Sequence, residues 1–304
     1  MPTFRFGVVF TAAYSPDEWR NTARRLEGEG FGSLLVADHY ANPMSCGPLM
    51  MAAAAATTTL RVGSYVYNND FRHLALLAKE AATIDVLSGG RLEIGLGAGW
   101  LKDEYDEAGL AFDPPGVRAS RFEESVGILK RLWRGETVHH AGEHYTLDGL
   151  TGTPLPVQHP LPLLIGGGGP RMLRFAVSEA DVVALVPRSL PSGGLDPADF
   201  SADAMDVKAR LIDDAIVSSE RGAPPERSAM VFGAYPSAAD AGDSEWIPQP
   251  LIADSPHAFV GDAARVEATL VERFKRWGLS YYVFFEEDIE KVVPVVRRLS
   301  GVTC

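Results

Sequence analysis

The residues of this sequence that are best suited to chemistry follow short apolar segments with the pattern of buried strands. His39 comes directly after Asp38, at the end of the apolar segment Gly32–Ala37. An imidazole titrates near neutral pH, so His39 is a candidate general acid or base. Asp38 could orient that ring or bind the polar edge of a ligand. The alternative interpretation is a structural histidine with its partner aspartate.

A run of glycines that precedes a proline is a second candidate, and it comprises Gly166, Gly167, Gly168 and Gly169. The N–H groups of such a run can approach an anion closely, and Pro170 suits the first position of a helix. A helix N-terminus attracts phosphate, so we expect phosphate here, with Arg171 or Arg174 as a charge partner. A flexible tight turn without a ligand is the competing interpretation.

A third group of small residues ends the segment Arg91–Ala98 and consists of Gly97, Ala98 and Gly99. Residues without bulky side chains let the backbone approach a flat ligand, and they also ease the turn from a strand into a loop. Trp100 follows, either as the wall of a pocket or as a core residue, which is the commoner use of tryptophan. The sequence leaves both interpretations open.

Other patterns argue against several classes of enzyme. The histidines at 139, 140 and 144 lack cysteine or carboxylate companions at metal-binding spacing, so a zinc site is not expected. The acidic strip Asp103–Glu107 has the composition of a solvated face. The chain has neither a Gly-x-Ser-x-Gly nucleophile motif nor a phosphate-loop lysine motif, which removes the main support for an esterase or a kinase.

The elements that must position these residues alternate between apolar segments and helical patterns. The expected strands are Phe4–Thr11, Gly32–Ala37, Leu60–Asn68, Arg91–Ala98, Leu161–Ile165, Asp181–Val186, Met230–Tyr235 and Ser280–Phe285. The expected helices begin at the capping box Ser15–Glu18 and then cover Leu49–Thr58, Phe71–Leu87, Arg118–Arg134, Pro170–Glu179, Asp203–Arg221, the segment capped by Asp262 and Asp288–Leu299. A hairpin is expected at Glu136–Leu150, and loops at Gly99–Gly116, Pro187–Asp199 and Pro236–Ala258.

Strand–helix alternation with uniformly apolar strands predicts a parallel sheet that is buried on both faces. Eight such units close into a (β/α)8 TIM barrel, here with insertion loops, and we expect one barrel domain over residues 1–304. An open doubly wound sheet is the rival, but it would want a Gly-x-Gly-x-x-Gly motif after the first strand, where this chain has Thr11-Ala12-Ala13-Tyr14. A barrel collects the residues after its strands at one mouth, where active sites lie.

The composition of the chain excludes some classes of binding partner. The chain has 304 residues, a formal net charge of −12 and two cysteines. The negative charge argues against binding to nucleic acid or an anionic membrane surface, and the low cysteine count suits a reducing cytoplasm. We find no signal-peptide pattern at the start of the sequence and no apolar run that could span a membrane.

Several motifs together resemble one family. They are Phe71-Arg72-His73, Ala78-Lys79-Glu80, Asp85-Val86-Leu87-Ser88-Gly89-Gly90-Arg91, Gly95-Leu96-Gly97-Ala98-Gly99-Trp100 and Pro154…Pro156…Gln158-His159-Pro160. With Asp38-His39 and the glycine run, they resemble the bacterial luciferase-like flavin and deazaflavin oxidoreductases over most of residues 4–186. The subtype resembles the actinobacterial members that use coenzyme F420, a deazaflavin.

The resemblance implies which residues would meet the cofactor. Asp38 and His39 would lie at its ring, with His39 in proton transfer, and Asn68 would lie near the pyrimidine edge. A non-proline cis peptide bond behind the ring aligns with Tyr65–Val66. The phosphate-binding loop aligns with Gly167–Gly169.

The resemblance also implies cofactors and partners. It indicates hydride transfer with F420, and the alternative is an FMN-dependent monooxygenase. A third hypothesis is a ligand-binding barrel that has lost catalytic activity. It further implies a homodimer, a small-molecule substrate and a reductase that supplies reduced F420 or flavin. The sugar-phosphate dehydrogenases of the family carry a catalytic glutamate where this chain has Trp100, so we expect a more apolar substrate.

Overall fold

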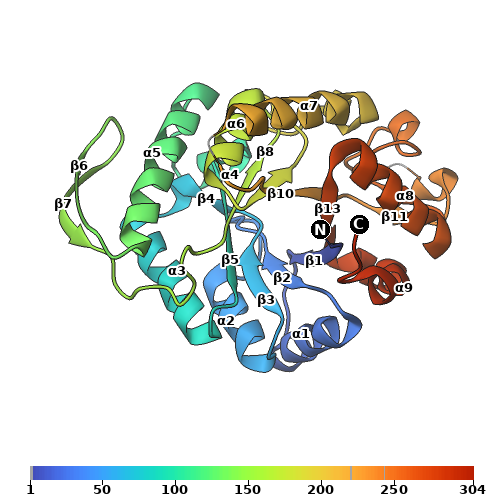
Figure 1. Ribbon diagram of the computed structural model, residues 1–304, viewed down its shortest axis with the longest axis horizontal. Helices are drawn as coiled ribbons and strands as arrows, with labels where there is room; N and C mark the ends of the chain where they lie inside the picture. Colours follow the sequence, from blue (N-terminus) through green and yellow to red (C-terminus); the bar gives the residue numbers. More distant parts are fainter. Residues whose placement is uncertain (1–2, 220, 243) are drawn as a thin grey trace.

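The computed structural model describes residues 3–219, 221–242 and 244–304, and within them a closed barrel of parallel strands forms the centre of the molecule (Figure 1). Its strands are β1 (Arg5–Phe10), β2 (Ser33–Val36), β3 (Arg61–Ser64) continued by β4 (Tyr67–Asn68), β5 (Leu92–Gly97), β8 (Leu163–Gly167), β9 (Val182–Leu185), β10 (Glu226–Val231) and β13 (Leu279–Phe285). β1 pairs with β2 and β13, and β3 pairs with β5, so the sheet has no free edge. The predicted (β/α)8 barrel is confirmed.

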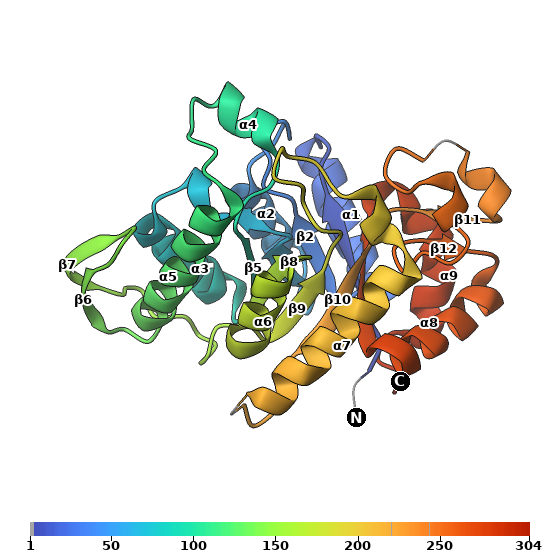
Figure 2. The same ribbon diagram turned by 90° about the horizontal axis from the view of Figure 1, so that it is seen from above.

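Helices surround the barrel, except for the short α4, which lies above the strands (Figures 1 and 2). They are α1 (Pro16–Glu29), α2 (Cys46–Ala56), α3 (Leu74–Ser88), α4 (Lys102–Glu107), α5 (Pro115–Trp133), α6 (Pro170–Glu179), α7 (Ala202–Ser218), α8 (Ala263–Trp277) and α9 (Ile289–Leu299). The capping box at Ser15 and Glu18 is formed as predicted. In the described part of the chain, no helix is long and apolar enough to cross a membrane.

The barrel interior is polar at its N-terminal end and apolar toward the mouth. At the N-terminal end, Arg5 donates to Glu93 over 2.8 Å, and the Tyr281 hydroxyl donates to the same carboxylate over 3.1 Å. Higher up, the interior is filled by Val9, Leu35, Ala37, Tyr65, Leu164, Val182, Ala184 and Val283. Four partly buried side chains lie on this layer, namely Val66, Val186, Met230 and Phe285. We call these four residues the apolar floor of the mouth.

Two predicted elements differ from the structure. The expected third strand is interrupted at Tyr65–Val66, where the peptide bond is cis as the resemblance implied. The seventh strand, β10, begins at Glu226, and Ala234–Tyr235 forms β11, which pairs outside the barrel with β12 (Phe259–Val260). The strand begins earlier because the polar residues Glu226 and Arg227 continue the pairing with β9.

The remaining predictions concern the hairpin, the end of α7 and the loops outside the barrel. The hairpin is formed by β6 (Thr137–Ala141) and β7 (Thr146–Thr151). α7 ends at Ser218 rather than at Arg221, and Glu220 lies outside the described residues. The expected loop 99–116 contains α4, which the sequence analysis missed. The described part of the loop 236–258 has only short 3-10 turns, and position 243 lies outside the described residues.

Candidate functional site

Four neighbouring strand ends bring the predicted residues to one mouth of the barrel. β2, β3 with β4, β5 and β8 follow one another around the barrel wall. Their C-terminal ends are followed by or include Asp38 with His39, Asn68, Gly97–Trp100 and Gly166–Gly169, respectively. The site therefore occupies one side of the mouth rather than its whole rim.

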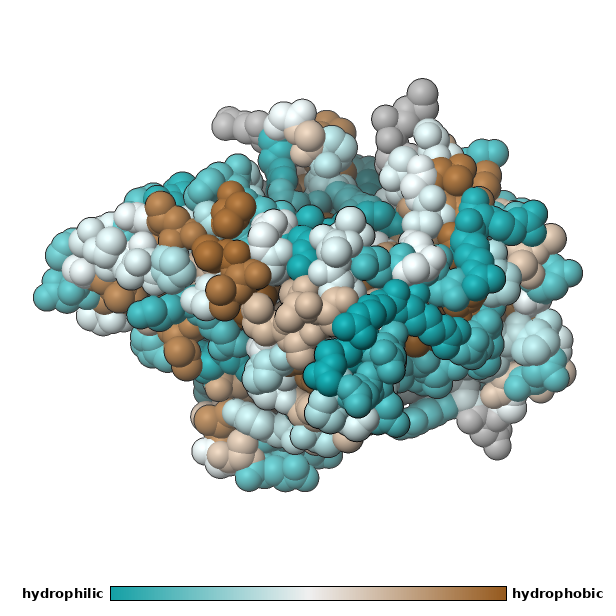
Figure 3. Space-filling model, turned by 90° about the horizontal axis from the view of Figure 1, so that it is seen from below, coloured by the Kyte–Doolittle hydropathy of each residue, from teal (hydrophilic) through white to brown (hydrophobic). Residues whose placement is uncertain are grey.

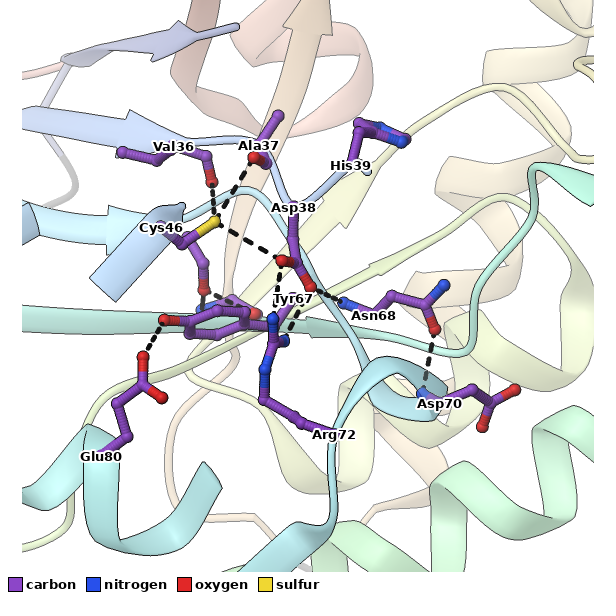
Figure 4. A network of polar contacts seen from close by, with 12 residues as sticks. Val36, Ala37, Asp38, His39, Cys46, Tyr67, Asn68, Asp70, Arg72 and Glu80 are labelled. Atoms are coloured by element: carbon purple, nitrogen blue, oxygen red, sulfur yellow. Dashed lines mark hydrogen bonds and ion pairs between the residues drawn. The ribbon is translucent and has the colours of Figure 1, made fainter. Parts of the chain in front are cut away.

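The Asp38 carboxylate accepts hydrogen bonds from several neighbouring segments on this side of the mouth. Its two carboxylate oxygens accept hydrogen bonds from the Arg72 guanidinium over 2.7 and 2.8 Å (Figure 4). The Asn68 N–H donates to the same carboxylate over 3.0 Å, and so does the thiol of Cys46 over 3.7 Å. Burial alone would lower the pKa of Arg72, but the hydrogen bonds and charge of Asp38 raise it. Asp38 thus ties the end of β4 and the start of α3 to β2.

His39 is oriented by a different carboxylate. Its side chain diverges from that of Asp38 (Figure 4), and its Nδ1 lies 2.8 Å from Oε2 of Glu104. The Trp100 ring packs edge-on against the imidazole, with 5.9 Å between ring centroids. A carboxylate can only accept, so Nδ1 carries the proton and Nε2 has a free lone pair in the neutral ring. His39 is 28% exposed at its side chain, so a ligand can reach it.

Glu104 belongs to the strip that the sequence analysis assigned to a solvated face, and that assignment is wrong for this residue. Glu104 and Tyr105 are buried on the inner side of α4, whereas Asp103, Asp106 and Glu107 are exposed. The tyrosine in the middle of the strip is a signal in the sequence that part of the strip is buried, because a large aromatic side chain is usually at least partly buried.

Tyr105 fastens α4 to the end of β4. Its hydroxyl donates to Asn68 Oδ1 over 3.0 Å and lies 3.1 Å from Asp70 Oδ2. Arg121 of α5 forms a bidentate pair with Asp70 over 2.8 and 2.9 Å. Burial is the main cause that raises the pKa of Tyr105, so its hydroxyl remains a donor. The side-chain oxygen of Asn68 is therefore used within the protein.

The glycines of the third group are explained by packing within the protein. A Cβ at Gly97 would lie 2.8 Å from Val66, and one at Gly99 would overlap the Tyr105 hydroxyl at 1.9 Å. Gly99 also has φ +78°, which favours glycine. Packing within the protein is therefore sufficient to account for glycine at positions 97 and 99. Ala98 and Trp100 remain partly exposed beside them.

The glycine run differs along its length. A Cβ at Gly168 would lie 2.6 Å from backbone atoms of Val186 and Arg188, and one at Gly167 would lie 2.5 Å from Met172, whereas one at Gly166 would make ordinary contact with Val66. Gly169 has ordinary extended backbone, with φ −88°, and a Cβ there would meet no atom of a described residue within 4 Å. Gly169 is the N-cap of α6, and no side chain in the described part of the chain caps that helix. The N-terminus of α6 is therefore open to an anion.

The two arginines next to this helix end have different surroundings. Arg171 forms a bidentate pair with Glu123 over 2.6 and 2.7 Å and is held by α5. Arg174 is exposed and forms no ion pair with a described residue. Of the two charge partners considered from the sequence, Arg174 is the one with a free guanidinium.

Comparison with known proteins places these features in context. Residues 3–243 match the family model described as luciferase-like monooxygenase. The chain is 32% identical over 200 residues to an F420-dependent glucose-6-phosphate dehydrogenase of Nakamurella multipartita, covering 63% of this chain and 58% of the relative. It is 29% identical over 214 residues to a 5,10-methylenetetrahydromethanopterin reductase of Archaeoglobus fulgidus, covering 67% of this chain and 62% of the relative.

The fold has close counterparts among solved structures. The coenzyme F420-dependent tetrahydromethanopterin reductase from Methanopyrus kandleri superimposes with a TM-score of 0.77, covering 98% of both chains at 20% identity. This likeness shows a shared fold. The sequence matches, by contrast, span less than two thirds of the length of the two curated relatives.

Proposed function

Because the chain belongs to the luciferase-like monooxygenase family, we propose that it is an oxidoreductase that binds coenzyme F420 at the mouth of the barrel. It would transfer a hydride between C5 of the deazaflavin and a small organic substrate. The observation that carries this proposal is the position of His39 at the mouth, where Glu104 holds Nδ1 and no hydrogen bond from a described residue occupies Nε2 of the partly exposed ring. Of the two curated relatives named above, the glucose-6-phosphate dehydrogenase is F420-dependent by name, and the other is a reductase by name.

The residues at the mouth fit a flat cofactor with a phosphate. The apolar floor of Val66, Val186, Met230 and Phe285 offers a surface for an aromatic ring system. The N-cap of α6 at Gly169 offers unpaired N–H groups and open space for an anionic group. The two features lie on the same side of the mouth, since a Cβ at Gly166 in β8 would contact Val66, which precedes β4, and only β5 lies between these strands.

The protein's own contribution would be proton transfer and orientation. When bound, F420 supplies a hydride donor or acceptor at C5. Reduction of a carbonyl or an enone also consumes one proton, which protonated His39 would donate from Nε2. In the oxidative direction, Nε2 of the neutral ring would accept the proton of the substrate hydroxyl. Water exclusion would come from Trp100 beside the imidazole.

The substrate class follows from the same surroundings. Trp100 takes the place at which the resemblance puts a catalytic glutamate in the sugar-phosphate dehydrogenases of the family. The stacked pair Tyr40 and Phe71, with centroids 4.2 Å apart, lies on the segment after β2 and on the turn before α3. Aromatic side chains of this kind favour apolar, planar compounds, so we propose an apolar enone, imine or carbonyl substrate.

Equilibrium binding of F420 and FMN to the purified protein tests the cofactor assignment. We expect micromolar affinity for F420 and an affinity for FMN that is at least about tenfold weaker, a difference of about 1.4 kcal/mol in binding free energy. Both titrations should be done at one salt concentration, because phosphate binding depends on screening.

The opposite order would support the alternative function, an FMN-dependent monooxygenase that uses reduced flavin and O2. The name of the family model is the observation that favours this alternative. Such an enzyme would depend on a flavin reductase, whereas the F420 enzyme would depend on a source of reduced F420. Binding of neither cofactor would contradict the phosphate assignment at Gly166–Gly169.

We also propose that the protein is a homodimer. Figure 3 views the side on which α1, α2 and α3 lie, and apolar residues gather there toward the β6–β7 hairpin, while the α1 side is hydrophilic. α3 exposes Leu76, Val86 and Leu87, with Leu87 66% exposed. α2 lies beside α3 and exposes the small residues Ala52 and Ala55. A second copy of the chain is the proposed occupant of this surface.

Light scattering coupled to size exclusion tests the dimer. We expect wild-type protein to elute at twice the mass of one chain, and Leu87→Lys to shift it to the monomer, because a buried unpaired ammonium opposes association. Val217→Lys on α7 is the matched control, since Val217 is 87% exposed on a different helix. A monomeric wild-type protein, or a Leu87→Lys dimer, would contradict the proposal.

A further inference from the structure

The short helix α4 buries a charged residue that the proposed chemistry has not yet used. Glu104 is only 3% exposed, although the helix is six residues long and its other acidic residues lie in solvent. A buried carboxylate is costly unless hydrogen bonds compensate for its lost hydration. The hydrogen-bond donors of Glu104 therefore indicate the role of this buried carboxylate.

Both hydrogen bonds of Glu104 come from the segment that follows β2. Oε2 faces Nδ1 of His39 at 2.8 Å, and Oε1 accepts from the Ala41 N–H over 3.3 Å. No other described residue donates a hydrogen bond to this carboxylate within normal distance. Glu104 thus fixes the His39 ring and the backbone beyond it, and it satisfies no helix end or loop elsewhere.

The carboxylate determines which ring nitrogen of His39 carries the proton. Because Glu104 is an acceptor, Nδ1 must donate, and Nε2 is then the unprotonated nitrogen of the neutral ring. Without that acceptor, the two tautomers would be free to exchange, and the ring would be free to rotate about its side-chain bonds. A proton acceptor must present its lone pair at a fixed place to be effective.

α4 is held on two sides in the position that this contact needs. On the inner side, Tyr105 hydrogen bonds Asn68 and Asp70. On the outer side, the tip of the segment 187–199 reaches the start of the helix, since a Cβ at Gly193 would lie 2.9 Å from Lys102 Cβ. Figure 2 shows this segment and α4 meeting above the strands. These contacts hold α4 in place, and with it the Glu104 carboxylate beside His39.

We propose that Glu104 is the positioning residue of His39: its carboxylate holds the Nδ1 proton and so directs the free lone pair of Nε2 to the reacting atoms. Asp38, the neighbour in sequence, does not serve this purpose because Arg72 occupies its carboxylate. The role of Glu104 in catalysis rests on the proposed function, whereas its control of the tautomer does not depend on any cofactor.

Nitrogen NMR of the imidazole rings tests the tautomer directly, in protein labelled with 15N-histidine and kept above the ordinary imidazole pKa of about 6.5. The chain has seven histidines, and the His39 signal is assigned by its loss in His39→Gln. We expect the Nδ1–H tautomer in wild type and in Glu104→Gln, whose amide oxygen still accepts. We expect a mixture or the Nε2–H tautomer in Glu104→Ala. Asp103→Ala, which removes an exposed carboxylate from the same helix, should resemble wild type.

Kinetics with reduced F420 and 2-cyclohexenone as the probe substrate test the catalytic part. We expect Glu104→Ala to lower kcat by about 100-fold, at the lower end of the range for general acid–base catalysis, with little change in KM or in F420 affinity. Glu104→Gln should retain most of the rate. If Glu104→Ala does not fold, the wild-type tautomer alone decides, because an Nε2–H form overturns the proposal.

The two levels of proposal fail in different ways. Absence of F420 binding in wild type overturns the proposed function but leaves the tautomer experiment valid. Full kcat in Glu104→Ala, with F420 turnover in wild type, overturns the positioning role alone. A change of tautomer in Asp103→Ala as large as that in Glu104→Ala would also overturn it, since the effect would then be a general property of charge on α4.

Discussion

Replacing His39 by alanine should reduce turnover of reduced F420 by about 10²- to 10⁴-fold, the usual contribution of a general acid or base. F420 affinity should change little, because the side chain that is lost would face the substrate edge while the apolar floor and the α6 N-terminus remain. Stability should fall by about 1–3 kcal/mol, because the buried Glu104 carboxylate loses the shorter of its two hydrogen bonds, and the fold should be retained. The measurement is kcat with 2-cyclohexenone, beside the F420 dissociation constant.

Two further variants make the result specific. His139→Ala removes a 70% exposed side chain that contacts Asp148 on the hairpin, so it should leave turnover unchanged. His39→Gln keeps a hydrogen-bond donor toward Glu104 without a titratable group, so it should be almost as slow as the alanine variant. Wild-type turnover in either His39 variant would remove the acid–base role and leave His39 as a structural residue.

The barrel was predictable because its signals are local. Segments such as Leu161–Ile165 are apolar throughout, and residues such as Ser15 and Gly30 mark the start and end of a helix. These signals depend on hydrogen bonding and burial within a few residues. Strand order then follows from the chain, because each strand–helix unit adds the next strand on one side.

The partners of the site were less predictable because they depend on contacts between distant elements. Asp38 and His39 are adjacent in sequence, but at consecutive positions their side chains diverge, and the carboxylate that His39 meets comes from residue 104. Tyr105 indicates that part of the acidic strip is buried, but the local sequence does not indicate which carboxylate meets His39. The distinction arises only when Tyr105 docks on Asn68 and turns one face of α4 inward.

The glycines show the same limit. Glycine is required at positions 97, 99 and 168 because of close contacts with Val66, Tyr105 and the backbone at Val186, respectively. These contacts join distant parts of the chain, so the sequence alone does not reveal them. Gly169 has no such neighbour, and its backbone conformation suits any residue. Because the fold does not require glycine at position 169, a substitution there can test the anion hypothesis without disturbing the fold.

Gly169→Asp should therefore separate folding from cofactor binding. Aspartate is a favourable N-cap residue, so the variant should be as stable as wild type or more stable by a few tenths of a kcal/mol. Its carboxylate would occupy the open end of α6 and repel a phosphate by about 4 kcal/mol at about 4 Å separation near a protein surface. We expect F420 affinity to fall by at least about 100-fold, measured by titration beside thermal unfolding.

Gly169→Asn is the matched neutral variant, because asparagine caps a helix about as well and has the same size. A moderate loss with asparagine and a large loss with aspartate would show that charge decides, as a bound phosphate requires. Equal losses would indicate steric exclusion of an uncharged group instead. Gly168→Ala, which forces a Cβ to within 2.6 Å of backbone atoms, should lower the unfolding temperature as well as the affinity. Undiminished F420 binding by Gly169→Asp would place the phosphate elsewhere, because no cofactor phosphate can share that helix end with a carboxylate at no cost.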